Sequence, residues 1–379
     1  MNFELEPKYK AIQNAALDLT RQIEPMAAEA DGLSVVHEGV LEALRESGLC
    51  RLMVPAKYGG TFESIDPLAI CVVREAMMAT SSHLDSLFAL QGIGSYAITV
   101  AGSDEQRNAW LPRIAEVEVL GALALTEEMA GSDLKAVSTE IQKIEQGLLV
   151  NGSKSYISNA GASSYFIVFA KEAGGYSTIL VPAKTDGVST KSSPELIAPH
   201  VLGDVCFDNV ILPDSARLGR QGDGLKNALA TLGVFRVSVA GAAVGLAQAA
   251  LDEAVKHTST RIQFGRPLAR LGPVAQMLAD CWTEIEMARL ITYRAATMAC
   301  EDPSSSLNQS SMAKLAASEM ASRVVDRCVQ MMGRWGLESQ SKIERLYRQA
   351  RPMRIYEGSS EVLRLGIAKQ LISESQQPI

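Results

Sequence analysis

The fold of this chain is decided near its end, by the stretch Arg354-Ile355-Tyr356-Glu357-Gly358-Ser359-Ser360-Glu361-Val362-Leu363-Arg364. It follows a helical run, and the helical spacing of apolar residues returns after it, so we expect Glu357 at a helix–loop junction. A carboxylate that is partly withdrawn from water has a raised pKa and can act as a base near neutral pH. Gly358 would let a substrate approach the backbone closely. A second interpretation stays open here, in which the stretch is only a helix end followed by a serine-capped helix.

The composition predicts a largely helical protein with more than one domain. The chain has 379 residues, which is long for a single hydrophobic core. Hydrophobic residues make up 47% of the chain but aromatic residues only 5%, so the core must consist mainly of aliphatic side chains. Alanine, leucine and methionine favour helices.

Charge and residue spacing argue against several classes of function. The net charge is −7 without a dense block of Lys and Arg, so nucleic-acid binding is not expected. The start of the chain lacks a signal-peptide pattern, and no uninterrupted apolar stretch reaches the roughly 20 residues that cross a bilayer. The six cysteines and four histidines are scattered, which predicts free thiols and no metal site. We therefore expect a cytoplasmic protein that is not bound to a membrane.

The period of the apolar residues changes twice along the chain and predicts three domains, at 1–118, 119–222 and 223–379. The fold class is α+β, mainly α: an N-terminal helical domain, a middle antiparallel β-barrel domain and a C-terminal four-helix bundle. The helices of the bundle are expected at about 224–260, 271–301, 308–333 and 341–372.

Two further local patterns bear on the fold. One predicts a turn, and the other matches a cofactor-binding fingerprint that we reject. Asn151-Gly152, between the apolar segment 148–150 and the segment 153–157 (Ser-Lys-Ser-Tyr-Ile), is typical of a two-residue hairpin turn. The segment 92–97, Gly-Ile-Gly-Ser-Tyr-Ala, matches the dinucleotide fingerprint G-x-G-x-x-A. That fingerprint requires a preceding strand, whereas the pattern around 92–97 is helical, so we do not expect a Rossmann fold.

The stretch around Glu357 resembles the catalytic segment of the acyl-CoA dehydrogenase family, whose usual form is Ile-Tyr-Glu-Gly-Thr-Ser-Glu/Gln-Ile. In that family the glutamate removes the α-proton of an acyl thioester. The resemblance covers essentially the whole chain, because four further motifs of the family occur in the expected order. They lie at Leu125–Asp133, Lys154–Ala160, Thr260–Pro267 and Gln330–Gly336.

This resemblance implies an FAD cofactor and assigns residues to it. Independently of the family, the glycine-containing loop 125–133 offers hydroxyl and N–H groups that suit a flat heteroaromatic ring, whereas Arg261 would be a solvated cation at a helix end. The resemblance assigns Arg261 to the cofactor, and guanidinium geometry suits a diphosphate. The residues implied to bind FAD are Thr126, Ser132, Tyr156, Ser158, Arg261, Gln263, Phe264, Gln330, Gly333, Ser359 and Glu361. Those implied to bind substrate are Ser132, Arg236 and Gly358.

The chain departs from the family pattern at several positions. Glu128 replaces a proline in the first motif, Arg334 replaces the second glycine of the last one, and Gln349 stands where an aspartate is usual. Some family members carry the base immediately before the arginine that matches Arg236. Here that position is Phe235, which leaves Glu357 as the only candidate for the base.

The implied activity is α,β-dehydrogenation of an acyl thioester, an oxidoreductase reaction on a CH–CH group (EC 1.3). Glu357 would take the α-proton, and flavin N5 would accept the β-hydride. Gly233 stands where an aspartate often contacts the pantetheine arm. The carrier is therefore expected to be CoA or an acyl carrier protein of a polyketide or non-ribosomal peptide pathway.

Other hypotheses about the function of this sequence stay open. The electron acceptor would be an electron-transfer flavoprotein or O₂, and a flavin-dependent oxidase or monooxygenase with this fold is the alternative enzyme. A flavin-free helical interaction protein is a third reading, which the presence of both Arg261 and Glu357 disfavours. A homodimer or homotetramer is expected, because the family shares its FAD site between subunits.

Overall fold

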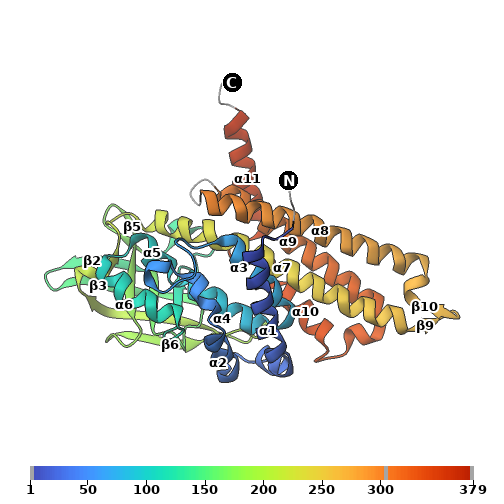
Figure 1. Ribbon diagram of the computed structural model, residues 1–379. Coiled ribbons are helices and arrows are strands. Elements are labelled where there is room, and N and C mark those ends of the chain that lie inside the picture. The colour runs from blue at the N-terminus through green and yellow to red at the C-terminus, as the bar shows by residue number, and fades with distance from the viewer. Residues whose placement is uncertain (1–3, 303–305, 376–379) are drawn as a thin grey trace. The chain divides into compact units, whose positions relative to one another are not determined.

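The computed structural model describes residues 4–302 and 306–375 (Figure 1). These residues form two compact units. Unit 1 contains the described residues of Met1–Asp31, Pro67–Asp85 and Arg236–Ile379, and unit 2 contains Gly32–Asp66 and Ser86–Phe235. This division differs from the predicted domain boundaries at 118 and 222, which stay a prediction.

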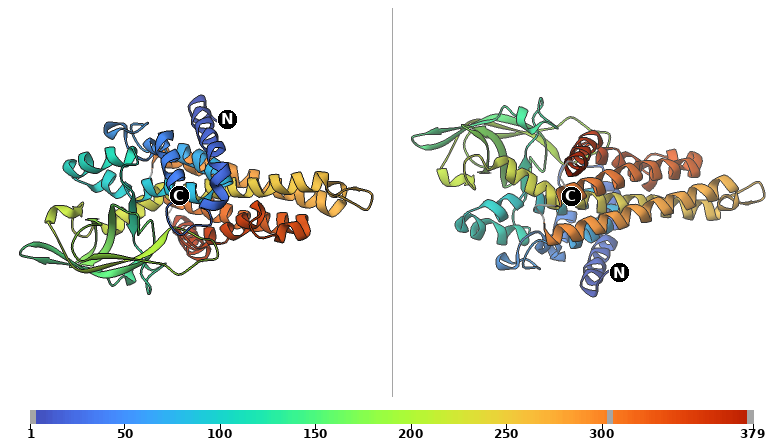
Figure 2. Two further views of the ribbon diagram at one scale, coloured as in Figure 1. Left: turned by 90° about the horizontal axis from the view of Figure 1, so that it is seen from below. Right: turned by 90° about the horizontal axis from the view of Figure 1, so that it is seen from above.

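Unit 1 is helical. Its helix α8 packs along α9, and α3 packs against both α1 and α8 (Figure 2). The α-helices that lie wholly in it are α1 (Pro7–Ala30), α3 (Pro67–Thr80), α8 (Gly272–Glu301), α9 (Leu307–Met332), α10 (Lys342–Ala350) and α11 (Ser360–Ser375). The chain passes between the units after Asp31, after Asp66, within α4 (Ser82–Ile93) and within α7 (Gly224–Thr260). The short elements are β9 (Ile262–Gln263), β10 (Arg266–Pro267) and the 3₁₀ turns η5 (Leu268–Arg270), η6 (Gly333–Leu337) and η7 (Pro352–Arg354).

The long C-terminal helices agree with the sequence prediction except in the last one. The run expected at 341–372 is broken into α10, η7 and α11, so that residues 355–359 form a loop. Pro352 opens η7, and a proline cannot continue a helix with full hydrogen bonding. The predicted helix–loop junction at Glu357 is therefore confirmed.

Helix α7 is rich in small residues, and these allow close packing on α3. A Cβ atom built on Gly245 would lie 1.9 Å from the carbonyl oxygen of Glu75, and one on Gly241 would lie 2.7 Å from that of Cys71. By length and composition α7 could cross a membrane, but 83% of its most apolar window is buried within the protein. Burial on this scale is typical of a core helix.

The helices of unit 2 are short. They comprise α2 (Glu38–Ser47), α5 (Tyr96–Ala101) and α6 (Asp104–Ala115), with the 3₁₀ turns η1 (Leu49–Met53), η2 (Ala56–Tyr58), η3 (Leu134–Ala136) and η4 (Asp214–Ala216). Gly48 ends α2 with φ +66°, the left-handed conformation expected of a glycine C-cap. The segment 92–97 spans the end of α4 and the start of α5, which confirms that the fingerprint there is not a Rossmann turn.

The second part of unit 2 is an eight-stranded sheet in the order β6-β7-β3-β2-β4-β5-β8, with β1 paired to β4. Its inner face buries an apolar core that includes Phe166, Val168 and Phe207. The strands are β1 (Gly121–Ala124), β2 (Glu140–Ile144), β3 (Gly147–Ser158), β4 (Tyr165–Glu172), β5 (Gly175–Pro182), β6 (Val188–Ser192), β7 (Leu202–Leu212) and β8 (Arg217–Leu218).

The sheet corrects the prediction of a purely antiparallel arrangement. Most neighbouring strands are antiparallel, but β4 pairs in parallel with both β1 and β2. A parallel partner requires a long connection. The β2–β3 hairpin lies between β1 and β4 in the sequence and supplies that length, a topology that alternation of apolar residues does not reveal.

The predicted hairpin turn at Asn151-Gly152 is wrong, because both residues lie inside the continuous strand β3. The register of β3 against β7 shifts between Val150 and Gly152, which marks a bulge. A Cβ on Gly152 would lie 2.5 Å from Thr139 Oγ1, and its φ is +146°. The glycine is thus required by a close approach of backbone and by the bulge.

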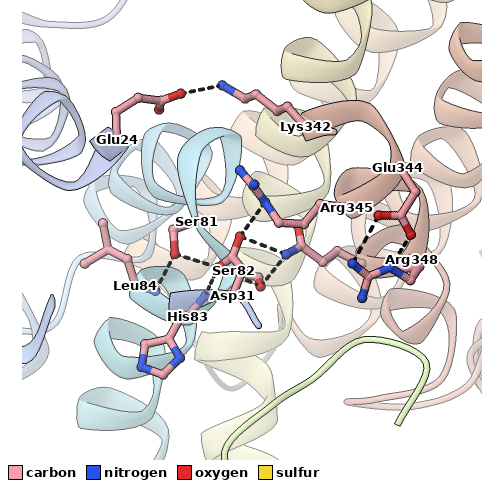
Figure 3. Close-up of polar contacts among 11 residues, drawn as sticks. Glu24, Asp31, Ser81, Ser82, His83, Leu84, Lys342, Glu344, Arg345 and Arg348 are labelled. Atoms are coloured by element: carbon pink, nitrogen blue, oxygen red, sulfur yellow. Dashed lines mark hydrogen bonds and ion pairs between the residues drawn. The ribbon is translucent and has the colours of Figure 1, made fainter. Parts of the chain in front are cut away.

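A buried polar cluster joins α1, α4 and α10 in unit 1 (Figure 3). Asp31, which is 3% exposed, accepts hydrogen bonds from Ser81 Oγ at 2.7 Å and from the backbone N–H of His83 at 3.0 Å. Its other oxygen lies 2.9 Å from Arg345 Nε and accepts from Gln349 Nε2 at 3.0 Å. Gln349, which departs from the family pattern, therefore contacts a carboxylate supplied by α1.

Candidate active site

The loop that carries Glu357 is held in a strained conformation. Glu357 has φ +52° and Gly358 has φ +101°, and the left-handed region is unfavourable for a residue with a side chain. The loop is closed on one side by the N–H of Tyr356, which donates to Pro352 O at 3.1 Å. On the other side Ser359 Oγ accepts from Val362 N at 3.4 Å and caps α11. Ser359, predicted to bind cofactor, thus also starts a helix.

Glu357 as a whole is half-buried, but the Oε2 atom of its carboxyl group is buried and, among the described residues, unsatisfied. Its Oε2 atom has no hydrogen-bond partner within residues 4–302 and 306–375. Burial raises the pKa of this group, and the positive charges of Arg74, Arg236 and Lys314 oppose that rise without cancelling it. A carboxyl group in this state is a usable proton acceptor near neutral pH.

The two backbone polar groups of Glu357 differ in their partners. Its carbonyl oxygen accepts a hydrogen bond from Arg236 Nε at 2.9 Å. Its N–H group finds no partner in the described part of the chain. The N–H group is therefore free to donate to an oxygen atom of a ligand.

Arg236 is 8% exposed, and both of its identified hydrogen bonds stay within unit 1. Besides Glu357 O, it donates from Nη1 to Ser311 Oγ at 3.0 Å. Burial lowers the pKa of its guanidinium, which the charge of Glu357 opposes. The contact of Arg236 with substrate stays a prediction, and the contact observed holds the backbone of Glu357.

A second arginine lies deeper beside the same loop. Arg74 donates from Nε and Nη2 to the two oxygens of Asp85, at 2.9 and 2.6 Å, and from Nη1 to Ser238 Oγ at 2.8 Å. Both partners of this ion pair are about 95% buried. Asp85 raises the pKa of the Arg74 guanidinium despite burial, so the arginine stays charged.

In unit 2 the loop of Thr126 is fastened to strand β3. Thr126 O accepts from Ser155 N at 2.9 Å, and the neighbouring Glu127 pairs with Lys154 Nζ at 2.8 Å. Burial raises the pKa of Glu127, but hydrogen bonds from Lys154, Ser138 and other donors hold it at about 2. A backbone bridge between Glu127 and Ala130 closes the turn, so the missing proline at position 128 is not needed for its shape.

Strand β3 also presents Tyr156 and Ser158, two residues of the predicted flavin set. The register against β7 shifts between Lys154 and Ile157, Tyr156 has φ +56°, and its side chain is 53% exposed. Ser158 Oγ lies 3.1 Å from His200 Nε2. His200 was not predicted as a site residue, because it lies in the segment between β6 and β7 and belongs to no motif.

In unit 1 the predicted cofactor residues Arg261, Gln263 and Phe264 lie at the β9–β10 turn and are exposed. Phe264 is 90% exposed and has φ +52°. The Arg261 guanidinium lies 4.7 Å from the ring centre of Trp335, and that of Arg334 lies 4.3 Å from the same ring. Arg334 is therefore held against an indole ring. This contact accommodates a side chain at a position where the family has glycine.

The remaining predicted residues lie at surface positions of their units. Gln330 is exposed in the last turn of α9, which Gly333 ends with φ +62°. Glu361 is exposed in the first turn of α11, and Ser132 is exposed in the loop before η3. These positions leave their side chains accessible, and their roles stay predictions.

The sequence prediction missed three charged residues that face Glu357, namely Arg74, Asp85 and Lys314, and also Ser311, which binds Arg236. All of them lie within helices and are buried. A charged residue at a core position of an amphipathic helix is the signal that would have identified Arg74 and Lys314, because such residues are buried only with a partner.

Comparison with known proteins places these features in a family. Three family models match the chain: acyl-CoA dehydrogenase N-terminal domain over residues 6–118, middle domain over 122–210 and C-terminal domain over 222–372. The chain is 34% identical over 361 residues to cyclohex-1-ene-1-carbonyl-CoA dehydrogenase of Geobacter metallireducens, which covers 93% of this chain and 94% of that protein.

Solved structures agree with the sequence comparison. Butyryl-CoA dehydrogenase from Megasphaera elsdenii superposes with a TM-score of 0.93 at 28% identity, covering 98% of this chain and 100% of that one. An acyl-CoA dehydrogenase from Bacillus anthracis complexed with FAD gives a TM-score of 0.90 at 25% identity, covering 98% of this chain and 68% of that one. The chain belongs to the acyl-CoA dehydrogenase family.

Proposed function

We propose that this protein is an FAD-dependent dehydrogenase of acyl thioesters in which Glu357 removes the α-proton. The observation that carries the proposal is the Glu357 carboxyl group, with a raised pKa and an Oε2 atom that has no partner in the described residues. A buried carboxylate without a hydrogen-bond partner is uncommon unless a ligand uses it.

The backbone of the same residue supports this chemistry. The α-proton of a thioester is acidic because the carbonyl oxygen accepts negative charge as the proton leaves. The N–H of Glu357 has no partner in the described residues and could donate to that oxygen, while Arg236 fixes the carbonyl of the same residue. A donor fixed before the reaction stabilises the developing charge most effectively.

The residues assigned to FAD fit such a group by their chemistry. Unit 2 offers the hydroxyl groups of Thr126, Ser132 and Ser158 and the exposed ring of Tyr156. Unit 1 offers the exposed guanidinium of Arg261 and the ring of Phe264. We also retain Gln263, Gln330, Gly333, Ser359 and Glu361 in the assignment. FAD, when bound, would accept the hydride that leaves the β-carbon of the substrate, and with it the two electrons of the oxidation.

Coenzyme A is the carrier that we propose, because the relatives named above act on CoA thioesters by their names. An acyl carrier protein is the competing carrier, and Gly233 is the residue that motivates it. The environment of Glu357 favours dehydrogenation over oxygen-using reactions that need no base. We propose an electron-transfer flavoprotein as the acceptor.

The test is an anaerobic titration of the purified flavoprotein, followed by the absorbance of the flavin near neutral pH. Matched acyl-CoA and acyl-carrier-protein thioesters are added to the wild-type protein and to Glu357→Gln. We expect bleaching by acyl-CoA in the wild type and a rate at least about 10²-fold lower in the variant, the usual contribution of a general base. Bleaching by the carrier-protein thioester alone would show that the substrate is carried on an acyl carrier protein and not on CoA. A protein without flavin, or a flavin that neither thioester reduces, would overturn the proposal.

A further inference from the structure

A buried lysine lies directly beneath the loop of the catalytic glutamate. Lys314, on α9, is 0% exposed, and its Nζ donates a hydrogen bond to the carbonyl oxygen of Gly358 at 2.7 Å. Gly358 immediately follows Glu357 and has φ +101°. The lysine thus binds the peptide group on the C-terminal side of the base.

A second cation binds the adjacent peptide group. Arg236, on α7, donates to the carbonyl oxygen of Glu357 at 2.9 Å, and Ser311 accepts from the same guanidinium at 3.0 Å. Ser311 and Lys314 are three residues apart on α9, so they lie on one face of that helix. Two consecutive carbonyl groups in left-handed backbone are therefore each held by a buried cation.

We infer that Lys314 is a positioning residue. It holds the strained loop through a hydrogen bond to Gly358 O, and it places a positive charge near the Glu357 carboxylate. The inference rests on the proposed function of Glu357. Ordinary packing does not explain a buried ammonium here, because an apolar side chain of equal length would avoid the loss of hydration.

The charged groups around Glu357 and Lys314 determine how removal of the lysine would change the pKa of Glu357. Glu357 faces Arg74 from α3, Asp85 from α4, Arg236 from α7 and Lys314 from α9. Lys314 faces Glu357, Arg236, Glu319 on its own helix and Glu361 on α11. Burial lowers the pKa of Lys314 to about 8, so its ammonium form is present at neutral pH and below. Loss of this positive charge must raise the pKa of Glu357 further.

Three variants test the inference. Lys314→Met removes charge and donor at similar length, Lys314→Gln removes the charge but keeps an N–H donor, and Arg323→Met is the control. Arg323 lies on the same helix and pairs with Glu284, away from the loop. If the Met variant does not fold, the Gln variant carries the test alone.

The first readout is hydrogen–deuterium exchange of the peptide that covers residues 355–363, measured without substrate. We expect exchange to be about 10-fold faster in Lys314→Met and unchanged in Arg323→Met, because the loop loses its anchor. This measurement does not depend on the chemistry of the loaded enzyme. Equal exchange in Lys314→Met and the wild type would overturn the positioning role.

The second readout is the pH profile of flavin reduction by acyl-CoA. We expect the acidic limb to move to higher pH by about one unit in both Lys314 variants, and the plateau of Lys314→Met to fall by about 10²-fold. A wild-type protein that acyl-CoA does not reduce would refute the proposed function itself. A reducible wild type with the same acidic limb in Lys314→Met would refute only the role of Lys314.

Discussion

Glu357 has a buried carboxyl group whose pKa is raised, and this has a consequence for stability. The folded protein keeps a proton on the group through a pH range in which the unfolded chain has already lost it. The free energy of unfolding therefore falls as the pH rises through that range. A glutamine has no such titration.

We expect Glu357→Gln to raise the Tm at pH 8 relative to the wild type, by about 2 °C or more. The difference should shrink at pH 5, because the wild-type carboxyl group takes up protons as the pH falls. Differential scanning fluorimetry of the two proteins at both pH values measures it. A Tm difference that does not depend on pH would mean that the carboxyl group of Glu357 is not destabilised by ionisation.

Glu127 makes the free energy of unfolding depend on pH in the opposite direction, because its pKa is lowered. Its pKa is held at about 2, below the value of about 4.3 for an unperturbed glutamate, so its contribution to stability is present above about pH 4.3 and is lost as the pH falls towards 2. Because Lys154 is buried with it, we expect Glu127→Gln to cost about 3 kcal/mol at pH 7.

The measurement for Glu127 is chemical unfolding at pH 7 and at pH 3. The difference between Glu127→Gln and the wild type should become smaller at pH 3. Glu128→Gln is the control, since Glu128 is exposed in the same loop, and we expect a change below about 0.5 kcal/mol for it. A cost for Glu127→Gln that is the same at both pH values would contradict this account.

Among the elements, the junction of α1, α4 and α10 depends on Asp31. Its carboxylate is shared by Ser81, His83, Arg345 and Gln349, all of which are buried. Removing the charge leaves the Arg345 guanidinium buried without its partner. We expect Asp31→Asn to lower the free energy of unfolding by about 3 kcal/mol.

The control for Asp31 is Asp18→Asn on α1, the helix that Asp31 directly follows, where the carboxylate forms an exposed ion pair with Arg21. Such pairs contribute about 0 to 1 kcal/mol. Urea unfolding followed by circular dichroism compares the two variants. Equal effects of the two substitutions would show that the Asp31 cluster does not stabilise unit 1.

The bulge in β3 makes a prediction about Gly152. A Cβ atom there would meet Thr139 at 2.5 Å and sit at φ +146°, whereas one on Gly161 would have no neighbour within 4 Å. We expect Gly152→Ala to destabilise the protein by about 2 kcal/mol or more and Gly161→Ala to be close to neutral. Thermal unfolding of both variants measures this, and a neutral Gly152→Ala would contradict the bulge.

The helices and strands also show which parts of the fold the sequence could predict. The helical runs at 224–260 and 271–301 were found because amphipathic spacing is a local property. The Asn151-Gly152 turn was wrong because the same dipeptide suits a turn and a bulge. The choice is made by contacts with Thr139 and with the distant strand β7, which the dipeptide itself does not reveal.

At the scale of the whole molecule, the candidate site could be predicted only in part. Glu357 was identified because its neighbours form a local motif. Arg74, Asp85 and Lys314 belong to no motif, and they surround Glu357 only because α3, α4 and α9 pack in unit 1. The parallel pairing of β4 was missed for the same reason, since no local pattern specifies which distant strands become neighbours.

The central claim is that Glu357 exchanges a proton with the α-carbon of an acyl thioester. The most direct test incubates the flavoprotein with an acyl-CoA in D₂O under anaerobic conditions and measures deuterium at the α-carbon by mass spectrometry. The account predicts deuterium in the recovered acyl-CoA with the wild-type protein and at least about 10²-fold slower exchange with Glu357→Gln. Exchange at the same rate in both proteins would contradict the assignment of Glu357 as the base.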